Sequence, residues 1–488
     1  MDSFIFNTTH PHYSDTIEQV RLVLDCVQGS WCVKYGDRNA EYLKNPSEAK
    51  DYVNYNGHND AKFLAYKDRA EFDGIPAHTL SRWCGAMSAS PPNIELPKSI
   101  DYLVSDSDGS GTPLSESIEM TQSSIAQVKF HCLLSDYNGV DIEGDLTDAQ
   151  AKSMGFKATI KHYPRQSLVD WDFGVVNGIK QLVYAKLTEE IAVVDHETGQ
   201  RKNLTSRLIL GLDDIGYYQR KATKPEPGSE GSSQELSEKK YPRDGSGNTF
   251  KKIPFEIIID QKDSMHSIPK SMGILYPICL KTITRYQVSA DYMASLHKAG
   301  SPTAWSSGWD AHSFEIFKDM TGSETFGSGI DAHIPLPPGG NIGYLTWDGD
   351  NNAFVVFMDN NQKQIRALGG AFNTSDSNDE AVGVAQLKQA EVLSSLINIA
   401  TSTEAGYMRS LKSCLQFMES APNFENIKLT INKEFDKVKI SPQQQDVIRK
   451  SYLDGVTDRE EALLQLKSGG VLIGDVEDIL KRATLTGE

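Results

Sequence analysis

An acidic run, DSDGSGTPLSES, is the nearest approach to a metal site in the sequence. Asp106, Asp108 and Ser110 occupy the first, third and fifth positions of a calcium-binding loop, where oxygen ligands are needed. The twelfth position is Ser117 instead of a bidentate glutamate, and Pro113 interrupts the loop. We therefore predict an acidic turn here and no metal site.

Two histidines near the N-terminus, His10 and His12, are a second candidate for metal binding. Histidines close to a chain end are more often solvated than bound to metal, so we expect two solvated side chains. The only close pair among the six cysteines is Cys26 and Cys32, whose spacing on a predicted helix suits neither a disulfide nor a zinc site. We expect buried thiols in a reducing compartment.

Signatures of catalysis are missing from the sequence. It has no GxxxxGK[ST] phosphate loop, no HExxH, no GxSxG and no paired CxxC, the motifs that announce common catalytic sites. Since no acid, base or nucleophile converges on one place in the pattern, we predict that the chain is not an enzyme and needs no cofactor.

Basic and aromatic residues in the second half could contact nucleic acid. Lys281, Arg285 and Lys298 lie on a predicted helix, and the first two share one side of it because they are four residues apart. They could equally form a solvated face. Trp305 and Trp309 flank a Ser/Gly turn; they could stack on a base or sugar, although packing at a subunit contact is the commoner use of such residues.

A polar stretch, GGAFNTSDSNDEA, separates two strongly helical runs at 369–381. It is longer than most connections between helices. The helix after it, about 380–420, is the longest in the sequence, and Ser377 with Glu380 forms a capping box that would start it. Gly406 is a plausible bend in that helix.

The remaining periodicity predicts a chain of the α+β class. Helices are expected at 14–34, 58–89, 113–135, 277–299 and 353–368, strands from 156 to 260, a loose exposed hairpin tip at 222–249, short strands and turns at 301–350, and a strand followed by two helices at the C-terminal end.

Length and charge limit the class of protein further. With 488 residues the chain can hold several domains. A formal charge of −17 argues against gripping nucleic acid over the whole surface, because phosphate binding needs clustered cations. It still permits a protein through which nucleic acid passes. The sequence shows neither a run of apolar residues long enough to span a membrane nor a secretion signal.

The order of these elements resembles the portal proteins of tailed bacteriophages. Four segments carry the resemblance: AYKDRAEFDGIPAHTLSRWCGAM, WDFGVVNGIKQLVYAKLTEE, KKIPFEIII followed by LKTITRYQVSADYMASLHKAGSPTAWSSG, and INKEF…YLDGVTDREEALLQLKSGGVL. Together they span most of residues 40–475 and look more narrowly like a group of phage proteins known only by an uncharacterised domain. The first 40 residues and the loop at 222–249 depart from that pattern.

The resemblance implies the portal fold, which assembles as a ring. Its parts here would be a wing of helices and antiparallel strands at 1–276, a stem helix at 277–300, a clip at 301–350, a second stem helix at 351–368, a tunnel loop at 369–380, a long wing helix and strand at 381–435, and a helical crown at 436–488.

The resemblance also implies a function. Twelve subunits would form a ring at one capsid vertex, through which double-stranded DNA is packaged and later ejected. Partners would be the terminase large subunit, a head-completion adaptor, and the major capsid and scaffolding proteins, with no membrane involved. The protein would reside in the virion and, during assembly, in the host cytoplasm.

Site residues follow from the same resemblance. The tunnel loop would approach DNA through Phe372, Asn373, Thr374, Ser375, Asp376, Ser377 and Asn378. Lys281, Arg285 and Lys298 would line the stem channel, and Trp305 and Trp309 would belong to the docking surface of the clip. Polar side chains can make exchangeable contacts with phosphates, while nearby acids oppose sticking.

Three other interpretations stay open at this stage. The polar stretch could be a plain surface loop between helices. The chain could be another structural protein of the virion, such as a tail or baseplate component, although the long helix favours the portal. It could also be a hydrolase that uses its acidic clusters.

Overall fold

The computed structural model contains helices and antiparallel strands, which confirms the α+β class. The residues that it describes are 6–44, 61–137, 155–194, 199, 201–223, 235–260, 268, 270–300, 303–322, 336–345, 351–369, 379–433, 435, 442–455 and 457–468. They divide into two compact units. Unit 1 comprises Met1–Thr16, Arg82–Gly273 and Gln389–Glu488, and unit 2 comprises Ile17–Ser81 and Ile274–Lys388.

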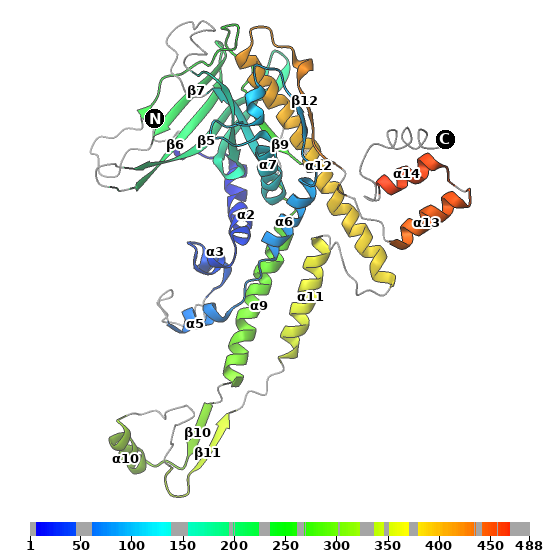
Figure 1. Ribbon diagram of the computed structural model, residues 1–488. Helices are drawn as coiled ribbons and strands as arrows, with labels where there is room; N and C mark the ends of the chain where they lie inside the picture. The colour runs from blue at the N-terminus through cyan, green and yellow to red at the C-terminus, as the bar shows by residue number, and fades with distance from the viewer. Residues whose placement is uncertain are drawn as a thin grey trace. The chain divides into compact units, whose positions relative to one another are not determined.

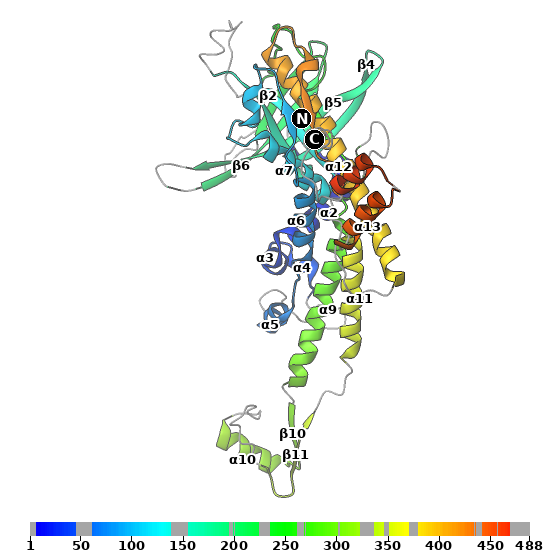
Figure 2. The same ribbon diagram turned by 45° about the vertical axis from the view of Figure 1, so that its right-hand side comes forward.

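A five-stranded antiparallel sheet is the larger of the sheets in unit 1 (Figures 1 and 2). In order, its strands are β4 (Leu168–Val176), β5 (Ile179–Val194), β6 (Arg201–Leu212), β7 (Tyr217–Thr223) and β8 (Glu235–Leu236). Asn177 and Gly178 join β4 to β5 with φ of 52° and 79°, the positive values that two-residue hairpin turns require. Strand order follows chain order, so the sheet is a meander.

A second sheet in unit 1 places β2 (Phe130–Tyr137) between β3 (Ala158–Pro164) and β9 (Phe255–Ile259). The helix α7 (Leu114–Val128) leads directly into β2. The sequence analysis predicted one helix over 113–135, and its last third is wrong. Lys129 has a φ of 83°, which ends the helix, and the residues after it pair on both sides as a buried strand.

The long helix α12 (Asp379–Met418) has 40 residues, close to the predicted span. Its Tyr407 and Cys414 are fully buried in unit 1. Gly406 has a role other than the predicted bend, since a Cβ there would lie 2.4 Å from Ile258 Cδ1. The glycine therefore lets the helix backbone approach β9 closely.

Smaller elements complete unit 1. A strand pair joins β1 (Asn93–Glu95) to β12 (Lys428–Thr430), and α13 (Pro442–Leu453) and α14 (Arg459–Ser468) follow near the C-terminal end. The second half of the predicted loose tip at 222–249 is ordered instead. There, β8 pairs with β7, and the Gly245 amide donates to the Gln416 carbonyl at 2.9 Å.

Unit 2 is built around α9 (Tyr276–Gly300). It also contains α3 (Ser30–Tyr35), α4 (Asn39–Tyr42), α5 (Ala61–Arg69) and α11 (Asn352–Leu368), while α2 (Pro11–Gln28) and α6 (Ile75–Met87) have residues in both units. The single helix predicted at 14–34 is two helices. Gly29 separates α2 from α3 with a φ of 100°, a value that only glycine adopts without strain.

Between α9 and α11 lies a short hairpin with its own helix. β10 (Thr303–Ser307) pairs with β11 (Asn341–Leu345), and α10 (Ala311–Thr321) lies between them in sequence. The sequence analysis predicted only strands and turns here and missed α10. The helix has strong local signals, a capping box between Asp310 and Ser313 and a left-handed Gly322 after its last turn.

Candidate functional site

The two helices α9 and α11 pack against each other along one side. Phe354, Met358, Asn361 and Ile365 recur at helical spacing and are the less exposed residues of α11, which is the pattern of a helix with one covered face. The Phe354 ring lies 5.9 Å from that of Tyr292 on α9. The predicted spans of both helices agree with the structure to within one residue at each end.

Two of the three predicted basic residues of α9 have partners within unit 2. Lys281 Nζ donates to Gln364 Oε1 at 2.6 Å, so its charge has a neutral partner. Arg285 pairs through Nε with the Asp73 carboxylate and donates from Nη1 to the Met358 carbonyl at 2.6 Å. Lys298 is on α9, but its side chain lies outside the described part. That these residues line a channel remains a prediction.

Arg285 joins three segments that are distant in sequence. Its side chain is about four-fifths buried, and it ties Asp73, which precedes α6, to both α9 and α11. A fixed fork of donors suits this multiple contact better than a lysine would. The structure thus gives Arg285 a positioning role that the sequence pattern did not suggest.

Most of the polar stretch after α11 lies outside the described residues. The helix ends at Leu368, Gly369 follows as its cap, and α12 begins at Asp379. Seven predicted site residues lie outside the described residues: Phe372, Asn373, Thr374, Ser375, Asp376, Ser377 and Asn378. The Glu380 side chain, which completes the predicted capping box with Ser377, also lies outside the described part. Contact between this loop and DNA therefore stays a prediction.

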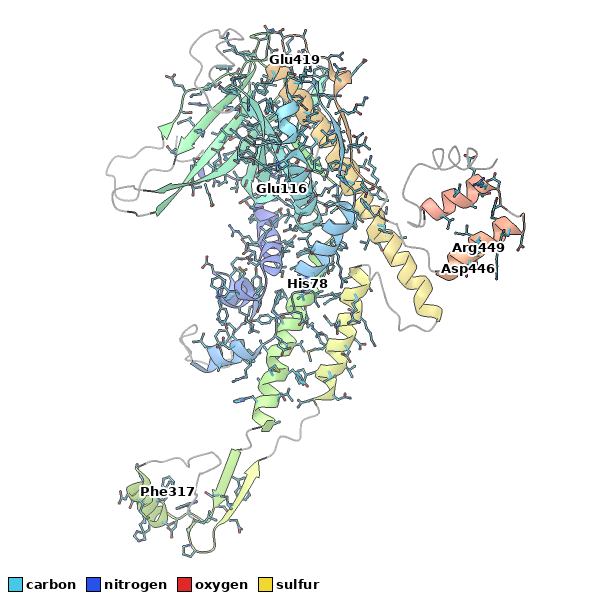
Figure 3. The ribbon with its side chains drawn as sticks, in the orientation of Figure 1. His78, Glu116, Phe317, Glu419, Asp446 and Arg449 are labelled. Atoms are coloured by element: carbon cyan, nitrogen blue, oxygen red, sulfur yellow. The ribbon has the colours of Figure 1, made fainter. Side chains whose placement is uncertain are left out.

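The two tryptophans of the hairpin differ in their surroundings. Trp305 faces Gly343 across the strand pair, and its indole occupies the space that a side chain at position 343 would need. Trp309 donates from Nε1 to Ser306 Oγ at 2.8 Å and packs edge-on against Phe317, with ring centroids 5.3 Å apart. Figure 3 shows Phe317 on α10. Trp309 is thus half-buried within this small element, and Trp305 is the more exposed of the two.

Apolar residues on the outside of α10 were missed by the sequence analysis. Ile316 and Met320, one turn apart, are exposed, Met320 by 80%. The repeat of large apolar residues on more than one face of AHSFEIFKDMT could have indicated them. Exposed apolar groups of this kind mark contact sites more often than isolated ones do.

The aspartates of the acidic run at residues 106–112 accept hydrogen bonds from backbone amides of the same loop. Asp106 Oδ1 accepts from the amides of Gly109 and Gly111 at 2.8 and 2.9 Å, and Asp108 accepts from the Ser110 amide at 2.8 Å. Burial acts to raise the pKa of Asp108, but hydrogen bonds from Ser110 and Thr112 outweigh it and lower that pKa. The carboxylates accept hydrogen bonds from the loop backbone and so hold the predicted acidic turn.

A buried network in unit 1 has the geometry of a nucleophile and its base. His162 Nε2 lies 2.7 Å from Ser117 Oγ, and His162 Nδ1 lies 3.0 Å from His131 Nε2. Ser117 Oγ also bonds to Tyr407 OH at 2.7 Å. An activated serine needs this kind of contact with a histidine that a third group orients.

The network has the marks of a structural element. Ser117 and Tyr407 are fully buried, so a substrate could not reach the hydroxyl in this structure. Burial and the neighbouring His162 lower the pKa of His131 to about 3, and burial lowers that of His162 to about 4. Both rings are therefore neutral at pH 7, and the chain of hydrogen bonds joins α7, β2, β3 and α12. No short-range signal links these residues.

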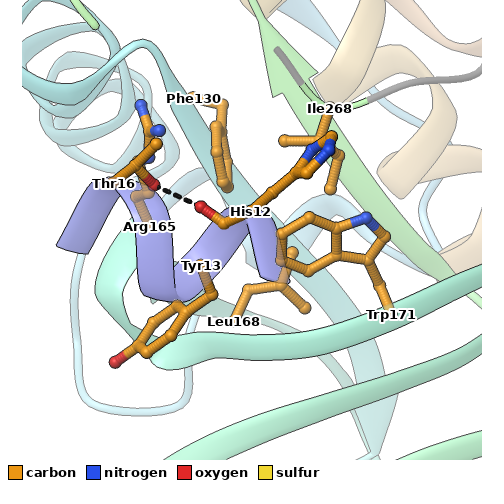
Figure 4. A pocket seen from close by; sticks show the side chains of 8 residues that line it. All are labelled: His12, Tyr13, Thr16, Phe130, Arg165, Leu168, Trp171 and Ile268. Atoms are coloured by element: carbon orange, nitrogen blue, oxygen red, sulfur yellow. Dashed lines mark hydrogen bonds between the residues drawn. The ribbon is translucent and has the colours of Figure 1, made fainter. Parts of the chain in front are cut away.

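The N-terminal histidines are packed and were predicted wrongly as solvated. The His10 ring stacks on Trp171 with centroids 4.0 Å apart, and the His12 amide donates to His10 Nδ1 at 3.1 Å. Burial, then His12, lowers the pKa of His10. Figure 4 shows the small pocket that His12 and Trp171 help to line. Its free space of about 10 Å³ is at most that of one water molecule.

In the part of the chain that the structure describes, no group of three or more His, Cys, Asp or Glu side chains could hold a metal ion. None of the described helices combines the length and the apolar character needed to cross a membrane.

Comparison with known proteins gives one family match. A domain of unknown function (DUF4055) matches residues 275–419. This range runs from the start of α9 through the hairpin and α11 to the end of α12. No curated protein matches the chain significantly.

Several solved structures overlap most of the chain. It is similar to a protein in the neck of an empty GTA particle computed with C6 symmetry (12% identity, TM-score 0.39, covering 84% of this chain and 94% of that one). A chain from the virion of a native gene transfer agent (GTA) particle is 13% identical with a TM-score of 0.40, and the match covers 84% of this chain and 94% of that one. A chain from the neck of the native GTA particle computed with C12 symmetry is 12% identical with a TM-score of 0.37, and the match covers 83% of this chain and 93% of that one.

Proposed function

We propose that this chain is a portal protein of a tailed bacteriophage. Twelve copies would form a ring at one vertex of the capsid, and double-stranded DNA would enter and leave through its centre. One observation carries the proposal. α9 and α11 form a packed helix pair that holds a compact hairpin element at one end, and the chain then continues into the 40-residue α12.

The helix pair has the dimensions of a channel wall. With 25 residues, α9 is about 37 Å long, so a ring of such pairs would enclose a tube rather than a shallow opening. The Asp73 carboxylate neutralises Arg285, and Lys281 bonds to a neutral amide. Lys281 keeps its charge, as do the exposed Lys363 and Arg366 of α11. Such a wall would meet phosphates with scattered cations instead of a cluster, and DNA would slide past it without being held.

Total charge supports passage in the same way. A ring of twelve chains, each with a formal charge of −17, would carry roughly −200, which repels phosphates at short range. We assign residues 369–380 to the tunnel loop at the start of α12, where Asn, Ser and Thr side chains would touch the duplex briefly.

The hairpin element formed by β10, α10 and β11 would be the surface on which partner proteins dock. Trp305, Ile316 and Met320 are exposed apolar residues on β10 and α10, and they would contact the terminase large subunit during packaging and the head-completion adaptor afterwards. Contacts with major capsid and scaffolding proteins would hold the ring in the virion. ATP hydrolysis would belong to the motor, because this chain would act through its shape and surface alone.

Native mass spectrometry with electron microscopy of the purified protein tests the proposal. We expect a ring of about twelve subunits with a central hole. A compact low-order oligomer without a hole, persisting across salt and protein concentration, would favour another structural protein of the virion. Two changes then test the parts within the ring.

Replacing residues 373–378 with a short glycine linker should leave rings intact and reduce DNA-filled particles. Deleting 306–340 should abolish docking of the motor and adaptor with rings preserved. Normal yields of filled particles in the first case, or retained docking in the second, would remove the assigned role of that segment.

A further inference from the structure

The helix α9 lies in the middle of unit 2 and is flanked on two sides. On one flank, Tyr66 OH of α5 donates to Asp291 Oδ1 at 2.6 Å, and Gln287 Nε2 donates to the Tyr42 carbonyl of α4 at 2.8 Å. On the other flank lies α11. Figures 1 and 2 agree that α3 and α5 lie on the side of α9 away from α11. Unit 2 therefore has two separate outer faces.

Trp31, Tyr35 and Leu64 form the first of these surfaces, named here the aromatic face. Trp31 is 70% exposed and lies one turn before Tyr35 on α3. Tyr35 OH donates to Asp68 Oδ1 at 2.6 Å, which holds the ring beside α5, and Leu64 lies one turn before Asp68. A tryptophan this exposed, on a side that its neighbours hold rigid, is the type of residue that anchors interfaces.

The second surface, the valine face, is the first two turns of α11. Phe354 and Met358 point toward α9, whereas Val355, Val356 and Phe357 are exposed, Val356 by 49% on the side opposite α9. This end of α11 is thus apolar around its whole circumference. Helices with that pattern are normally covered on all sides, yet the rest of α11 turns polar residues outward.

Both faces have charged residues at their edges, with Asp68 beside Lys34 and Lys363 one turn after Asp359. Lys34 lies between Trp31 and Tyr35 on α3, and among the described residues its Nζ donates to the Asp68 backbone carbonyl at 3.3 Å. Asp359 lies one turn after Val355 on α11. Neither residue forms an ion pair with the described residues. Bringing two aromatic faces together would oppose lysine to lysine, and two valine faces would oppose aspartate to aspartate.

We propose that the aromatic face of one copy docks on the valine face of the next copy. This head-to-tail contact deepens the proposed ring and rests on it, since different faces on opposite flanks generate a closed ring when the rotation closes. The occupant of each face is a second copy of this chain, with Trp31 packing near Val356 and Lys34 facing Asp359.

Mixing two defective variants tests the polarity of the contact. Trp31→Asp and Val356→Asp should each remain monomeric at concentrations where the unaltered chain assembles, with self-association weakened at least ~30-fold. Mixed in equal amounts, they should form a one-to-one dimer and nothing larger, because each supplies one intact face. Sedimentation velocity resolves monomer, dimer and ring.

A matched control and a charge exchange complete the design. Met120 on α7 is exposed to nearly the same extent as Val356, so Met120→Asp should assemble normally. Lys34→Glu and Asp359→Lys should each weaken assembly, and the double variant should recover it. Circular dichroism of each monomer shows whether it is folded.

Each of the following results would overturn the docking proposal. Normal rings from both aspartate variants would show that other surfaces join the copies, while the portal function would stand. Larger assemblies in the mixture, or one variant forming symmetric dimers alone, would show a like-with-like contact. If the unaltered chain forms no ring at any concentration, the ring itself is wrong and the docking proposal fails with it.

Discussion

Side chains are usually polar at the surface and apolar in the interior of a protein. The interior of unit 1 contains polar side chains, whereas the surface of unit 2 exposes large apolar ones. Unit 1 buries His131, His162 and Ser117 in a hydrogen-bonded chain that ends on Tyr407. Unit 2 leaves Val356, like Trp31, exposed to solvent. A buried polar group is tolerated when it is bonded, and an exposed apolar group of this size is expected where a partner covers it.

This difference separates residues that fold one copy from residues that would join copies. Changes in the interior of unit 1 should lower the free energy of unfolding of a single chain. Changes on the two faces of unit 2 should leave that free energy nearly unchanged. Four predictions, from the largest expected effect to the smallest, test the distinction.

A side chain at position 406, where the α12 backbone approaches Ile258 closely, should give the largest loss of stability. Gly406→Val would place its side chain against Ile258, 2.4 Å from the position of the first carbon alone. We expect the free energy of unfolding to fall by about 3 kcal/mol, measured by urea denaturation. Gly85→Ala on α6, where nothing lies within 4 Å, should instead stabilise by up to ~1 kcal/mol. Equal effects at the two glycines would contradict the packing argument.

The buried histidine pair should make unit 1 sensitive to acid. Folding lowers the pKa of His131 from 6.5 to about 3 and that of His162 to about 4. Between these values and 6.5 the unfolded chain binds protons that the folded chain does not, so stability should be complete above pH 6.5 and fall toward pH 4. Urea denaturation at several pH values measures this slope.

Replacing both histidines separates their contribution from that of His10, whose pKa is also lowered. His131→Gln with His162→Gln should flatten most of the slope between pH 4 and 6.5, and His10→Asn only a minor part. At pH 7, His162→Leu should cost about 2 kcal/mol, because it leaves Ser117 with one bond fewer in the interior. An unchanged slope in the double variant would show that other groups cause it.

The two basic residues of α9 should differ in their effect on unit 2. Arg285→Met removes the contacts with Asp73 and with the Met358 carbonyl, and should cost about 1 to 2 kcal/mol. Lys281→Met removes a single exposed bond to Gln364 and should cost less than ~0.5 kcal/mol. Thermal and urea unfolding of the two variants gives the comparison. Equal losses would mean that Arg285 has no special positioning role.

Stability should change least on the two outer faces of unit 2. Trp31→Asp and Val356→Asp should alter the free energy of unfolding of the monomer by less than ~0.5 kcal/mol, measured at concentrations below those of assembly. A loss of 2 kcal/mol or more in either variant would show that the side chain supports the fold of its own copy, contrary to its exposure.

Helix lengths in the second half of the chain followed from local pattern alone. The periodicity of α9, α11 and α12 gave spans close to the observed ones, because the spacing of apolar residues and the end signals act over a few residues. The same local signals were present for α10 in Asp310 and Gly322, but the glycine- and proline-rich surroundings hid them. Lys129 shows the limit of such patterns, since nothing local indicates that a lysine will end a helix in the left-handed region.

Sequence by itself therefore determined the class of the chain, its acidity, its long helices and the absence of familiar catalytic motifs. Tertiary structure alone decided which polar groups meet. Ser117, His162 and Tyr407 come from three distant segments, as do Asp73, Arg285 and Met358. The physical reason is range: periodicity and capping depend on neighbours within a turn or two, whereas burial and hydrogen-bond partners depend on where remote segments pack.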